Sequence, residues 1–431
     1  MDALTPHAHW ILTLFLLGYA SIVLEEIIHI NKTTTALFMA VACWTILFLE
    51  PGETTSQHLD LLQIQMFKVC QVLFFLWGAL ITVETVNAYG GFLIISRYLL
   101  VQSKILLLWM AGILAFFLSS VLDNLTTTIV MLSIIQKLLD KHEDRLLIGG
   151  AVVIAANAGG AWTPIGDVST TVLWIGERVT TVPLVRDLFL PCFLSLIFFL
   201  FLNQFALRGS LATPKESLPS PKPYGVLVLI LGVLGLIFVP IYKIMTDLPP
   251  FIGMMLTVAM LWLVTDFLAA IKPQLSLPRV TNVLPHIDVS IILFYLGLLL
   301  SIMALESAGL LQALALWLNS HIANPFIIVI AIGLASALVD NVSLVAATLG
   351  MYSLKTFGTD SEFWQLMSYC AGTGGSILII GSAAGVALMA LERATFGWYL
   401  RYITWKALAT YAFGILIYFM MRSLFHPAVS A

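Results

Sequence analysis

Two acidic residues stand next to asparagines near the middle of long apolar stretches. They are Asp123-Asn124 and, 217 residues later, Asp340-Asn341. An ionisable side chain deep in an apolar segment costs several kcal/mol, so it usually faces a cavity or an ion pathway. An Asp-Asn pair can also cap the helix that follows, because its oxygens accept hydrogen bonds from free N–H groups. Since the pair occurs twice in corresponding places, we predict an ion-binding role, which can coexist with capping.

A third acidic residue follows a stretch in which a continuous helix is unfavourable. Gly159-Gly160 costs about 1 kcal/mol per residue in a helix, and Pro164 costs about 3 kcal/mol. Unwinding would free carbonyl oxygens beside the side-chain oxygens of Asn157 and Asp167. Such oxygens, without sulfur or imidazole, form the ligand set that a hard cation such as sodium prefers. Close helix packing through the glycines is the alternative, but it leaves Asp167 unexplained.

The corresponding stretch later in the chain is less acidic. It keeps Gly374-Gly375 but has Ser382 where Asp167 would be, so two candidate aspartates lie in the first half and one in the second. Interrupted apolar segments in corresponding places point to an ion site at the middle of a membrane. The four interrupted stretches are 119–128, 155–171, 336–343 and 372–385.

Three further titratable residues give weaker signals. Glu84 and Glu306 lie near the ends of equivalent apolar segments, where an interfacial role and a role in the ion path both remain open. His29 lies at the end of the first apolar segment, where solvated helix ends are usual. Its imidazole could nevertheless titrate near neutral pH and contribute to pH sensing.

The composition indicates that these residues are positioned inside a membrane. Of the 431 residues, 60% are hydrophobic and 10% are charged, so the bilayer must be the solvent for much of the chain. The net charge is −3 and the basic residues are scattered, which excludes a nucleic-acid-binding protein. The four cysteines lie singly in apolar runs. We therefore expect neither a disulfide framework nor a zinc site, and no cofactor.

Ten apolar segments are long enough to cross about 30 Å of hydrocarbon as helices. They lie at roughly 9–30, 34–50, 61–86, 146–178 and 186–207, and then at 224–244, 250–271, 287–306, 363–392 and 399–424. Residues 208–223 contain four prolines with Ser, Lys and Glu, so they form a linker rather than a packed helix. The chain thus divides into 1–207, the linker 208–223, and 224–431.

The two halves match as an internal duplication. The Asp-Asn pairs correspond at a spacing of 217 residues, and Gly159-Gly160 corresponds to Gly374-Gly375 at 215. Each Asp-Asn pair divides a region, about 104–139 or 323–354, into arms that are short for a full crossing, as in a re-entrant hairpin. Each half then makes five crossings, an odd number, so the second half is inverted.

The predicted fold is therefore an all-α polytopic membrane protein. It has two inverted repeats, each with a re-entrant hairpin and a discontinuous helix, the latter at about 146–178 and 363–392. In this topology fourteen of the 20 Lys and Arg residues lie on one side, which should be cytoplasmic. The linker would be cytoplasmic and both termini outside. The chain start lacks the basic region of a secretory signal, and we expect a multi-pass protein of the bacterial inner (plasma) membrane.

At these residues the sequence resembles the NhaD-type sodium/proton antiporters, a branch of a superfamily that includes sodium-coupled dicarboxylate carriers. The resemblance rests on segments 119–128 and 157–171 and on Asp340-Asn341, and it covers nearly the whole chain. It implies a scaffold domain, a transport domain that contains the two hairpins, and usually a homodimer. No Thr-Pro follows Gly374-Gly375 in the second half, so that broken helix is expected to be shaped differently.

The residues and the resemblance together define the predicted ion site. Sodium is expected to bind Asp123, Asn124, Asn157 and Asp167. The complete predicted set for sodium and protons is Ser119, Asp123, Asn124, Thr126, Asn157, Gly159, Gly160, Thr163, Asp167, Ser169, Thr170, Ser336, Asp340, Asn341, Ser376 and Ser382.

Three functions fit a membrane protein with such a site: sodium/proton antiport, sodium-coupled uptake of a di- or tricarboxylate, and a channel or non-transporting scaffold. Like charges about 5 Å apart repel by roughly 3 kcal/mol at an effective dielectric near 20, which disfavours an anionic substrate. Inverted repeats with broken helices suit alternating access better than a continuous pore. We predict a secondary transporter, not an enzyme, that exchanges sodium, with lithium as a second candidate, for protons. It would support sodium extrusion and pH homeostasis.

Overall fold

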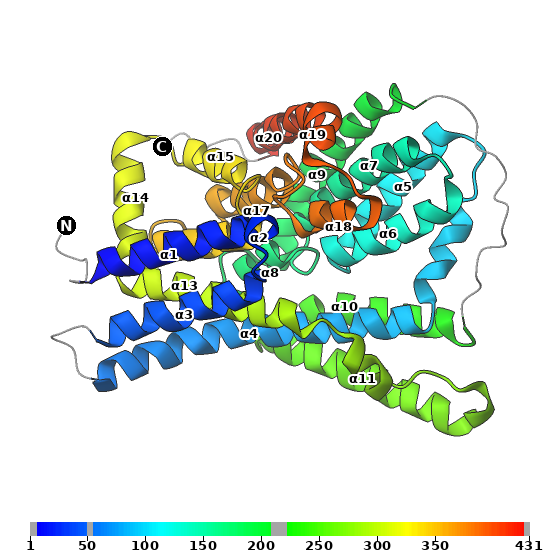
Figure 1. Ribbon diagram of the computed structural model, residues 1–431, viewed down its shortest axis with the longest axis horizontal. Coiled ribbons are helices and arrows are strands. Elements are labelled where there is room, and N and C mark those ends of the chain that lie inside the picture. Colours follow the sequence, from blue (N-terminus) through cyan, green and yellow to red (C-terminus); the bar gives the residue numbers. More distant parts are fainter. Residues whose placement is uncertain (1–6, 50–54, 208–221, 426–431) are drawn as a thin grey trace.

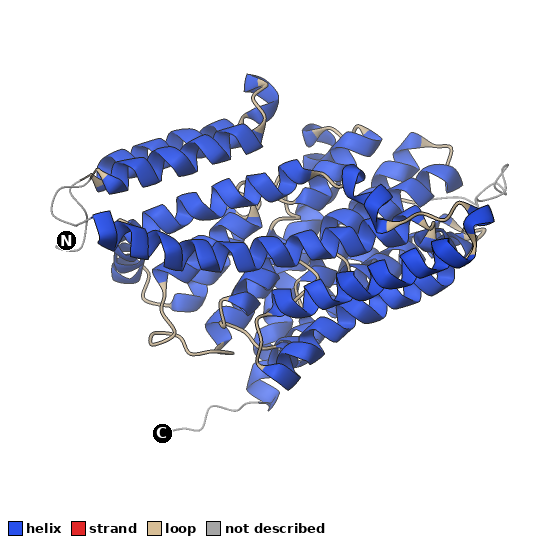
Figure 2. Cartoon of the chain, turned by 90° about the horizontal axis from the view of Figure 1, so that it is seen from below, coloured by secondary structure: helices blue, strands red, loops and turns tan. Residues whose placement is uncertain are grey.

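The structure is a computed structural model that describes residues 7–49, 55–207 and 222–425. Every regular element in these ranges is a helix (Figures 1 and 2). Within them, six helical segments are long and apolar enough to cross a membrane, or seven if a bent pair counts as one span. The predicted all-α membrane fold is confirmed at this level. Most of the predicted linker, 208–221, lies outside the described residues.

The first half contains ten helices within the described ranges. They are α1 (Ala8–Val23), α2 (Glu25–Ile28), α3 (Lys32–Phe48), α4 (Thr55–Ala88), the 3-10 helix η1 (Gly91–Leu99), α5 (Lys104–Ser119), α6 (Asn124–Leu138), α7 (His142–Gly160), α8 (Val168–Ile175) and α9 (Thr181–Gln204). The predicted segment 9–30 is thus divided between α1 and α2, and η1 was not predicted.

The second half contains fourteen helices within the described ranges. Its helices are α10 (Gly225–Thr246), α11 (Pro250–Ile271), η2 (Pro273–Leu275), α12 (Val280–Val283), η3 (Leu284–His286), α13 (Val289–Ser307), α14 (Leu310–His321), α15 (Pro325–Ala335), α16 (Asn341–Met351), α17 (Glu362–Gly374), α18 (Ala383–Glu392), α19 (Phe396–Tyr399), the π-helical turn η4 (Leu400–Thr404) and α20 (Trp405–Phe425). The sequence did not predict α14, which forms the bent pair with α15 at 120°.

The helices break at all four interrupted stretches. One break separates α5 from α6 and a second separates α15 from α16, both at the Asp-Asn pairs. The other two follow Gly160 and Gly374, where α7 and α17 end. The count of ten crossings stays a prediction, because α1 and α3 have only 16 and 17 residues whereas a straight span needs about 20.

The short helices pack in pairs within and between the halves. In the first half α5 packs against α7, and in the second α15 packs against α17. Between the halves, α6 packs against α18 and α16 against α8. A second layer, in which α13 packs against α3 and α4, and α11 against α4 and α10, lies along the lower side of Figure 1. The helix breaks of both halves thus face one another above this layer.

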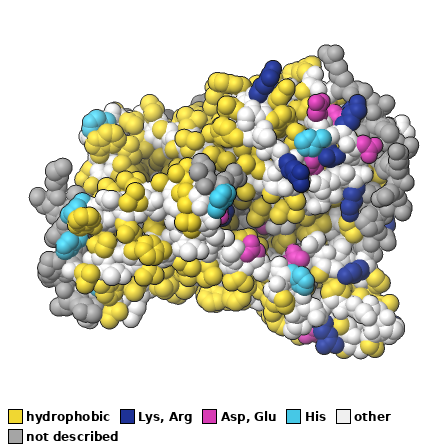
Figure 3. Space-filling view, viewed as in Figure 1, with side chains coloured by type: hydrophobic (Ala, Val, Ile, Leu, Met, Phe, Trp, Pro, Cys, Tyr) yellow, Lys and Arg dark blue, Asp and Glu magenta, His cyan; other side chains and the backbone are white. Residues whose placement is uncertain are grey.

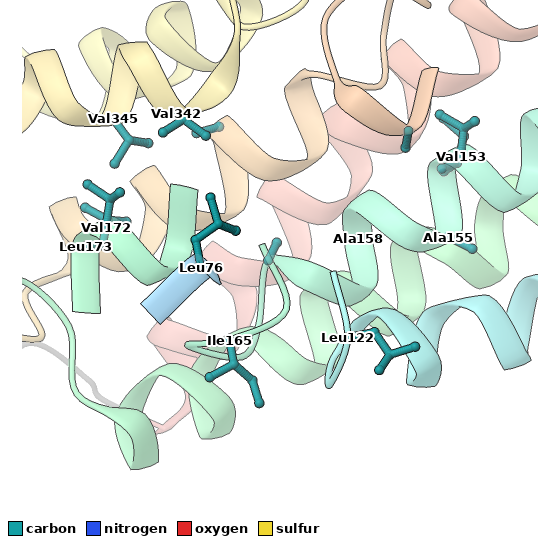
Figure 4. Close-up of a cluster of buried hydrophobic side chains, with 14 of the residues drawn as sticks. Leu76, Leu122, Val153, Ala155, Ala158, Ile165, Val172, Leu173, Val342 and Val345 are labelled. Atoms are coloured by element: carbon teal, nitrogen blue, oxygen red, sulfur yellow. The ribbon is translucent and has the colours of Figure 1, made fainter. Parts of the chain in front are cut away.

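Glycines permit the close approach of the paired helices. A Cβ atom added at Gly159 would collide with the carbonyl oxygen of Phe116 on α5, and one added at Gly374 would collide with that of Gly333 on α15. Close packing through glycine, the alternative to ion binding at these positions, is therefore realised at both. Apolar side chains complete the surroundings: Figure 4 shows those of α8 and α16 near Leu76 of α4.

Candidate ion-binding site

Asp167 lies at the centre of the site, in the break between α7 and α8. It caps the N-terminus of α8, because its Oδ1 accepts hydrogen bonds from the backbone N–H and the hydroxyl of Ser169, both at 2.7 Å. The Asp167 side chain is buried, with 1% of the residue surface exposed. A buried carboxylate is costly unless donors surround it, and the remaining donors come from the two hairpins.

One asparagine from each half donates to this carboxylate. Asn124, the first residue of α6, donates from Nδ2 to Asp167 Oδ2 at 2.8 Å. Asn341, the first residue of α16, donates to Oδ2 at 3.2 Å and to Oδ1 at 3.3 Å. The two asparagines that correspond in the sequence therefore meet at a single aspartate.

A second polar chain links the halves beside Asp167. Asn157, fully buried on α7, accepts from Asn124 Nδ2 at 2.9 Å and donates from its own Nδ2 to the hydroxyl of Ser382 at 2.9 Å. Ser382 caps α18 by accepting from the N–H of Gly385 at 3.2 Å. Ser382 thus occupies in α18 the capping position that Asp167 occupies in α8, without its charge. We call these five residues, Asn124, Asn157, Asp167, Asn341 and Ser382, the central network.

The other two aspartates cap the second arms of the hairpins. Asp123 accepts from the Thr126 N–H at 2.7 Å and from the Thr126 hydroxyl at 2.6 Å. Asp340 accepts from the Ser343 N–H at 3.3 Å, and Lys32 attracts its carboxylate electrostatically. Capping is therefore confirmed at both positions, and the ion-binding role of these carboxylates stays a prediction. Among the described residues, no Lys or Arg forms an ion pair with Asp123, Asp167 or Asp340.

Five predicted site residues use their hydroxyls to fasten backbone segments. Their acceptors are backbone carbonyls: Ser119 donates to Ala156, Thr163 to Ser120, Thr170 to Gly160, Ser336 to Gly333 and Ala371, and Ser376 to Thr373, over 2.6–3.4 Å. Those of Ser119, Thr163 and Ser336 join a broken helix to a hairpin, whereas those of Thr170 and Ser376 bond within a broken helix. None of the five bonds to Asp167. Gly160 contributes through its lack of a side chain, since an added Cβ would crowd the carbonyl oxygen of Gly166.

The three weaker candidates lie outside the central network. His29 is exposed at the end of α2, with a φ of 57°. Glu306, near the end of α13, packs against Gly350. Glu84, on α4, lines a cavity of about 380 Å³. Thr126 of α6, whose hydroxyl bonds to Asp123, lines the same cavity. Of the three, only Glu84 lines a cavity that is also lined by a hydrogen-bond partner of a predicted ion ligand.

Two tyrosines near the aspartates were missed by the sequence analysis. The hydroxyl of Tyr19, on α1, accepts from the Asp340 N–H at 3.1 Å and lies 3.1 Å from the hydroxyl of Ser343. Tyr295, on α13, lies within electrostatic range of Asp123, Asp167 and Asp340. A single tyrosine in an apolar span resembles the aromatic residues of a membrane interface, so no sequence signal distinguished them.

Comparison with known proteins gives the same assignment as the residues. Residues 19–354 match the family described as "Citrate transporter". The chain is 47% identical, over 95% of its length and 72% of the relative, to "Sodium/proton antiporter 1" of Arabidopsis thaliana. It is 43% identical, over 95% of its length and 99% of the relative, to "Sodium/proton antiporter 2" of the same plant. The "Na(+)/H(+) antiporter NhaD" of Vibrio cholerae is 28% identical over 95% of the chain and 91% of the relative. The chain belongs to the NhaD-type branch of this transporter family.

Membership confirms the resemblance drawn from the Asp-Asn pairs and the Gly-Gly breaks. This NhaD-type chain is a multi-pass membrane protein with a nearly all-helical fold. The two plant relatives give no support to the expected bacterial inner membrane.

Proposed function

We propose that this chain exchanges sodium for protons by alternating access, with the ion bound at the central network. The observation that carries this proposal is the buried carboxylate of Asp167, which accepts hydrogen bonds from one asparagine amide of each half of the chain. A ligand at this carboxylate would touch both hairpin tips at once, so its binding can be coupled to their movement. The three relatives described above are all named sodium/proton antiporters, which supports the same exchange.

A cation fits the charge of the site better than an anion. Three aspartates are close enough to the buried Tyr295 for their charges to act on it. No basic side chain among the described residues forms an ion pair with any of the three. An added carboxylate at about 5 Å would be repelled by roughly 3 kcal/mol for each charge at an effective dielectric near 20. The family description favours a second candidate, citrate or another carboxylate as substrate, and the transport assay must include it.

The mechanism follows from what the amides donate and accept. In the structure Asn124 and Asn341 direct Nδ2 at Asp167, so both amides donate to its carboxylate. Sodium would displace these donors, and rotation of each amide would bring its Oδ1 to the ion, since an amide offers both a donor and an acceptor end. A proton bound to the carboxylate instead removes the charge that holds sodium. Sodium and protons therefore compete for one site, and Asp123 adds its charge to the same competition.

We infer two inverted repeats with re-entrant hairpins, a scaffold layer and a homodimer as the framework for this cycle. The repeats are supported by matched contacts: Ser119 and Ser336 each bond to a carbonyl of the neighbouring broken helix, and Asp123 and Asp340 each cap a hairpin arm. The orientation rests on charge, because Lys and Arg gather toward one end of the face seen in Figure 3. That end would be cytoplasmic and both termini outside.

The test is exchange in everted membrane vesicles loaded with a pH-sensitive dye. We expect sodium, and lithium to a smaller or equal extent, to dequench the dye, while potassium and citrate leave it unchanged. Inactive Asp167→Asn vesicles with equal amounts of protein serve as the control. Dequenching by citrate, or sodium-driven citrate uptake in the same vesicles, would reject antiport in favour of the carboxylate carrier.

A further inference from the structure

The cavity beside α6 has an acidic group that the central network does not use. Its volume is about 380 Å³, and it lies between α4 and η1 on one side and α6 with the residues before α13 on the other. Exposed residues Lys137 and His286 lie at its rim, and Thr126 lies at its inner wall. Because the Thr126 hydroxyl bonds to Asp123 at 2.6 Å, one hydrogen-bonded residue separates the cavity from the first predicted ion ligand.

Apart from Glu84, the ionisable groups of the cavity are already hydrogen-bonded or carry a positive charge. Asp288 caps α13 by accepting from the N–H of Ser290 at 2.9 Å and from its hydroxyl. His286 Nδ1 lies 2.9 Å from the carbonyl oxygen of Asn282. Lys137 carries a positive charge. It has no ion-pair partner within the described part of the chain.

Glu84 differs from these groups because its carboxylate has capacity to spare. Within the described ranges its only hydrogen-bond donor is Asn87, one turn along α4, whose Nδ2 lies 3.3 Å from both Oε1 and Oε2. A carboxylate can accept about four hydrogen bonds, so this long, shared contact orients Glu84 without satisfying it. The free lone pairs are available to a water-bound ion in the cavity.

We propose that this cavity is an antechamber in which Glu84, oriented by Asn87, holds a hydrated monovalent cation before it passes Thr126 to Asp123. This inference rests on the proposed function, which it extends by naming the route and its first ligand. Glu84 and Asp288 against Lys137 give the cavity a net charge of −1 with His286 neutral, and a negative cleft with low-dielectric walls raises the local concentration of cations. Glu84 would therefore set how readily sodium reaches the site, and not how fast the loaded carrier moves.

The first experiment measures the charge of the cavity without transport. Ser133, half-buried in the cavity wall, is changed to cysteine in a Cys70→Ser background, because Cys43, Cys192 and Cys370 are already buried. Cationic and anionic methanethiosulfonates are then compared by their rates of reaction. We expect the cationic reagent to react faster, and Glu84→Gln to lower the ratio of the two rates about threefold or more.

Three matched variants sharpen this measurement. Glu84→Asp keeps the charge and should keep the ratio, and Lys137→Gln should raise it. Glu306→Gln removes a carboxylate on α13 that does not line the cavity, so it should leave the ratio unchanged. An unreactive Ser133→Cys, or a ratio that Glu84→Gln does not move, would overturn the antechamber.

The second experiment tests the role in transport. In the vesicle assay Glu84→Gln should raise the sodium concentration for half-maximal exchange about threefold or more and leave the maximal rate unchanged, whereas Glu84→Asp should restore the parent value. An unchanged half-saturation would reject recruitment by Glu84 while leaving antiport intact. Absence of exchange in the parent protein would instead count against the proposed function, and the reagent ratio would still decide whether the antechamber exists.

Discussion

The two hairpin tips carry the same Asp-Asn pair but have different surroundings. At the first tip, Asp123 is held by Thr126 over 2.6 and 2.7 Å, and Thr126 lines the cavity. At the second, Asp340 has longer bonds to Ser343, 3.3 and 3.4 Å, and Tyr19 of α1 lies against both residues. The first tip thus adjoins a cavity, whereas α1 lies against the second.

Under the proposed function, the two tips therefore contribute unequally to one ion site. The asparagines of both tips still converge on Asp167, but Ser382 replaces the second buried aspartate. One carboxylate therefore serves both halves, and the tips differ in their access to it. Four substitutions should separate these contributions, with effects that decrease from Asp167 to Asp123, Asp340 and Tyr19.

Asp167→Asn should have the largest effect and abolish sodium-driven proton movement. Asparagine can neither bind a proton at its amide nor carry the charge, and its own Nδ2 would face donors from Asn124 or Asn341. Loss of the charge lowers sodium affinity by about 3 kcal/mol, over a hundredfold. The assay is dye dequenching over pH 6 to 9 at several sodium concentrations, after size-exclusion chromatography establishes a monodisperse protein. Near-normal exchange in a folded mutant would refute the shared-carboxylate mechanism.

Asp123→Asn should also abolish exchange, but it should preserve the fold better than Asp123→Ala does. Asparagine is a good N-cap, so α6 keeps its cap while the charge disappears. The comparison variant is Asp123→Ala, which loses both the cap of α6 and the charge and should lower the free energy of unfolding by about 1 kcal/mol. If Asp123→Asn exchanges sodium normally and only Asp123→Ala is impaired, the aspartate is a cap and nothing more.

The breaks and caps that underlie these predictions were accessible from the sequence because their causes are local. Adjacent glycines weaken a helix, and Asp or Ser at a helix start accepts from free N–H groups. These rules located the ends of α5, α7, α15 and α17. They also gave the oxygen-rich stretches from which the central network is built.

The assembly of the site depends on tertiary packing and was less accessible. Asn341 reaches Asp167 across 174 residues of chain, and no local rule places one asparagine of each half on a single carboxylate. For the same reason Ser376 was assigned to the site although its hydroxyl bonds to the Thr373 carbonyl. The contact of Tyr19 with Asp340 likewise depends on how α1 lies against the second half.

Asp340→Asn should reduce sodium affinity less than Asp123→Asn. Lys32 attracts the Asp340 carboxylate, so part of the negative charge that the mutation removes is already compensated. Asparagine keeps the cap of α16, and the amide of Asn341 still reaches Asp167. The check is dye dequenching over a range of sodium concentrations at one pH, with protein amounts matched: Asp340→Asn should still exchange, at a higher half-maximal sodium concentration than the parent, whereas Asp123→Asn should not exchange. Equal or larger losses in Asp340→Asn would show that the two tips share the ion evenly.

Tyr19→Phe should have the smallest effect on affinity, and it should act on the closure of the second tip. The mutation removes the hydroxyl that accepts from Asp340 and contacts Ser343, while the ring stays in place. Each such hydrogen bond contributes about 0.5–1.5 kcal/mol, so the tip should open about threefold to tenfold more often. Val339→Cys, half-buried beside Asp340 at the second tip, in the Cys70→Ser background, would report this opening through faster labelling by a membrane-impermeant thiol reagent and leaves Ser343 in place. Tyr98→Phe is the control, because Tyr98 is 63% exposed on η1. Unchanged labelling in Tyr19→Phe would mean that packing of α1, and not its hydroxyl, keeps the second tip closed.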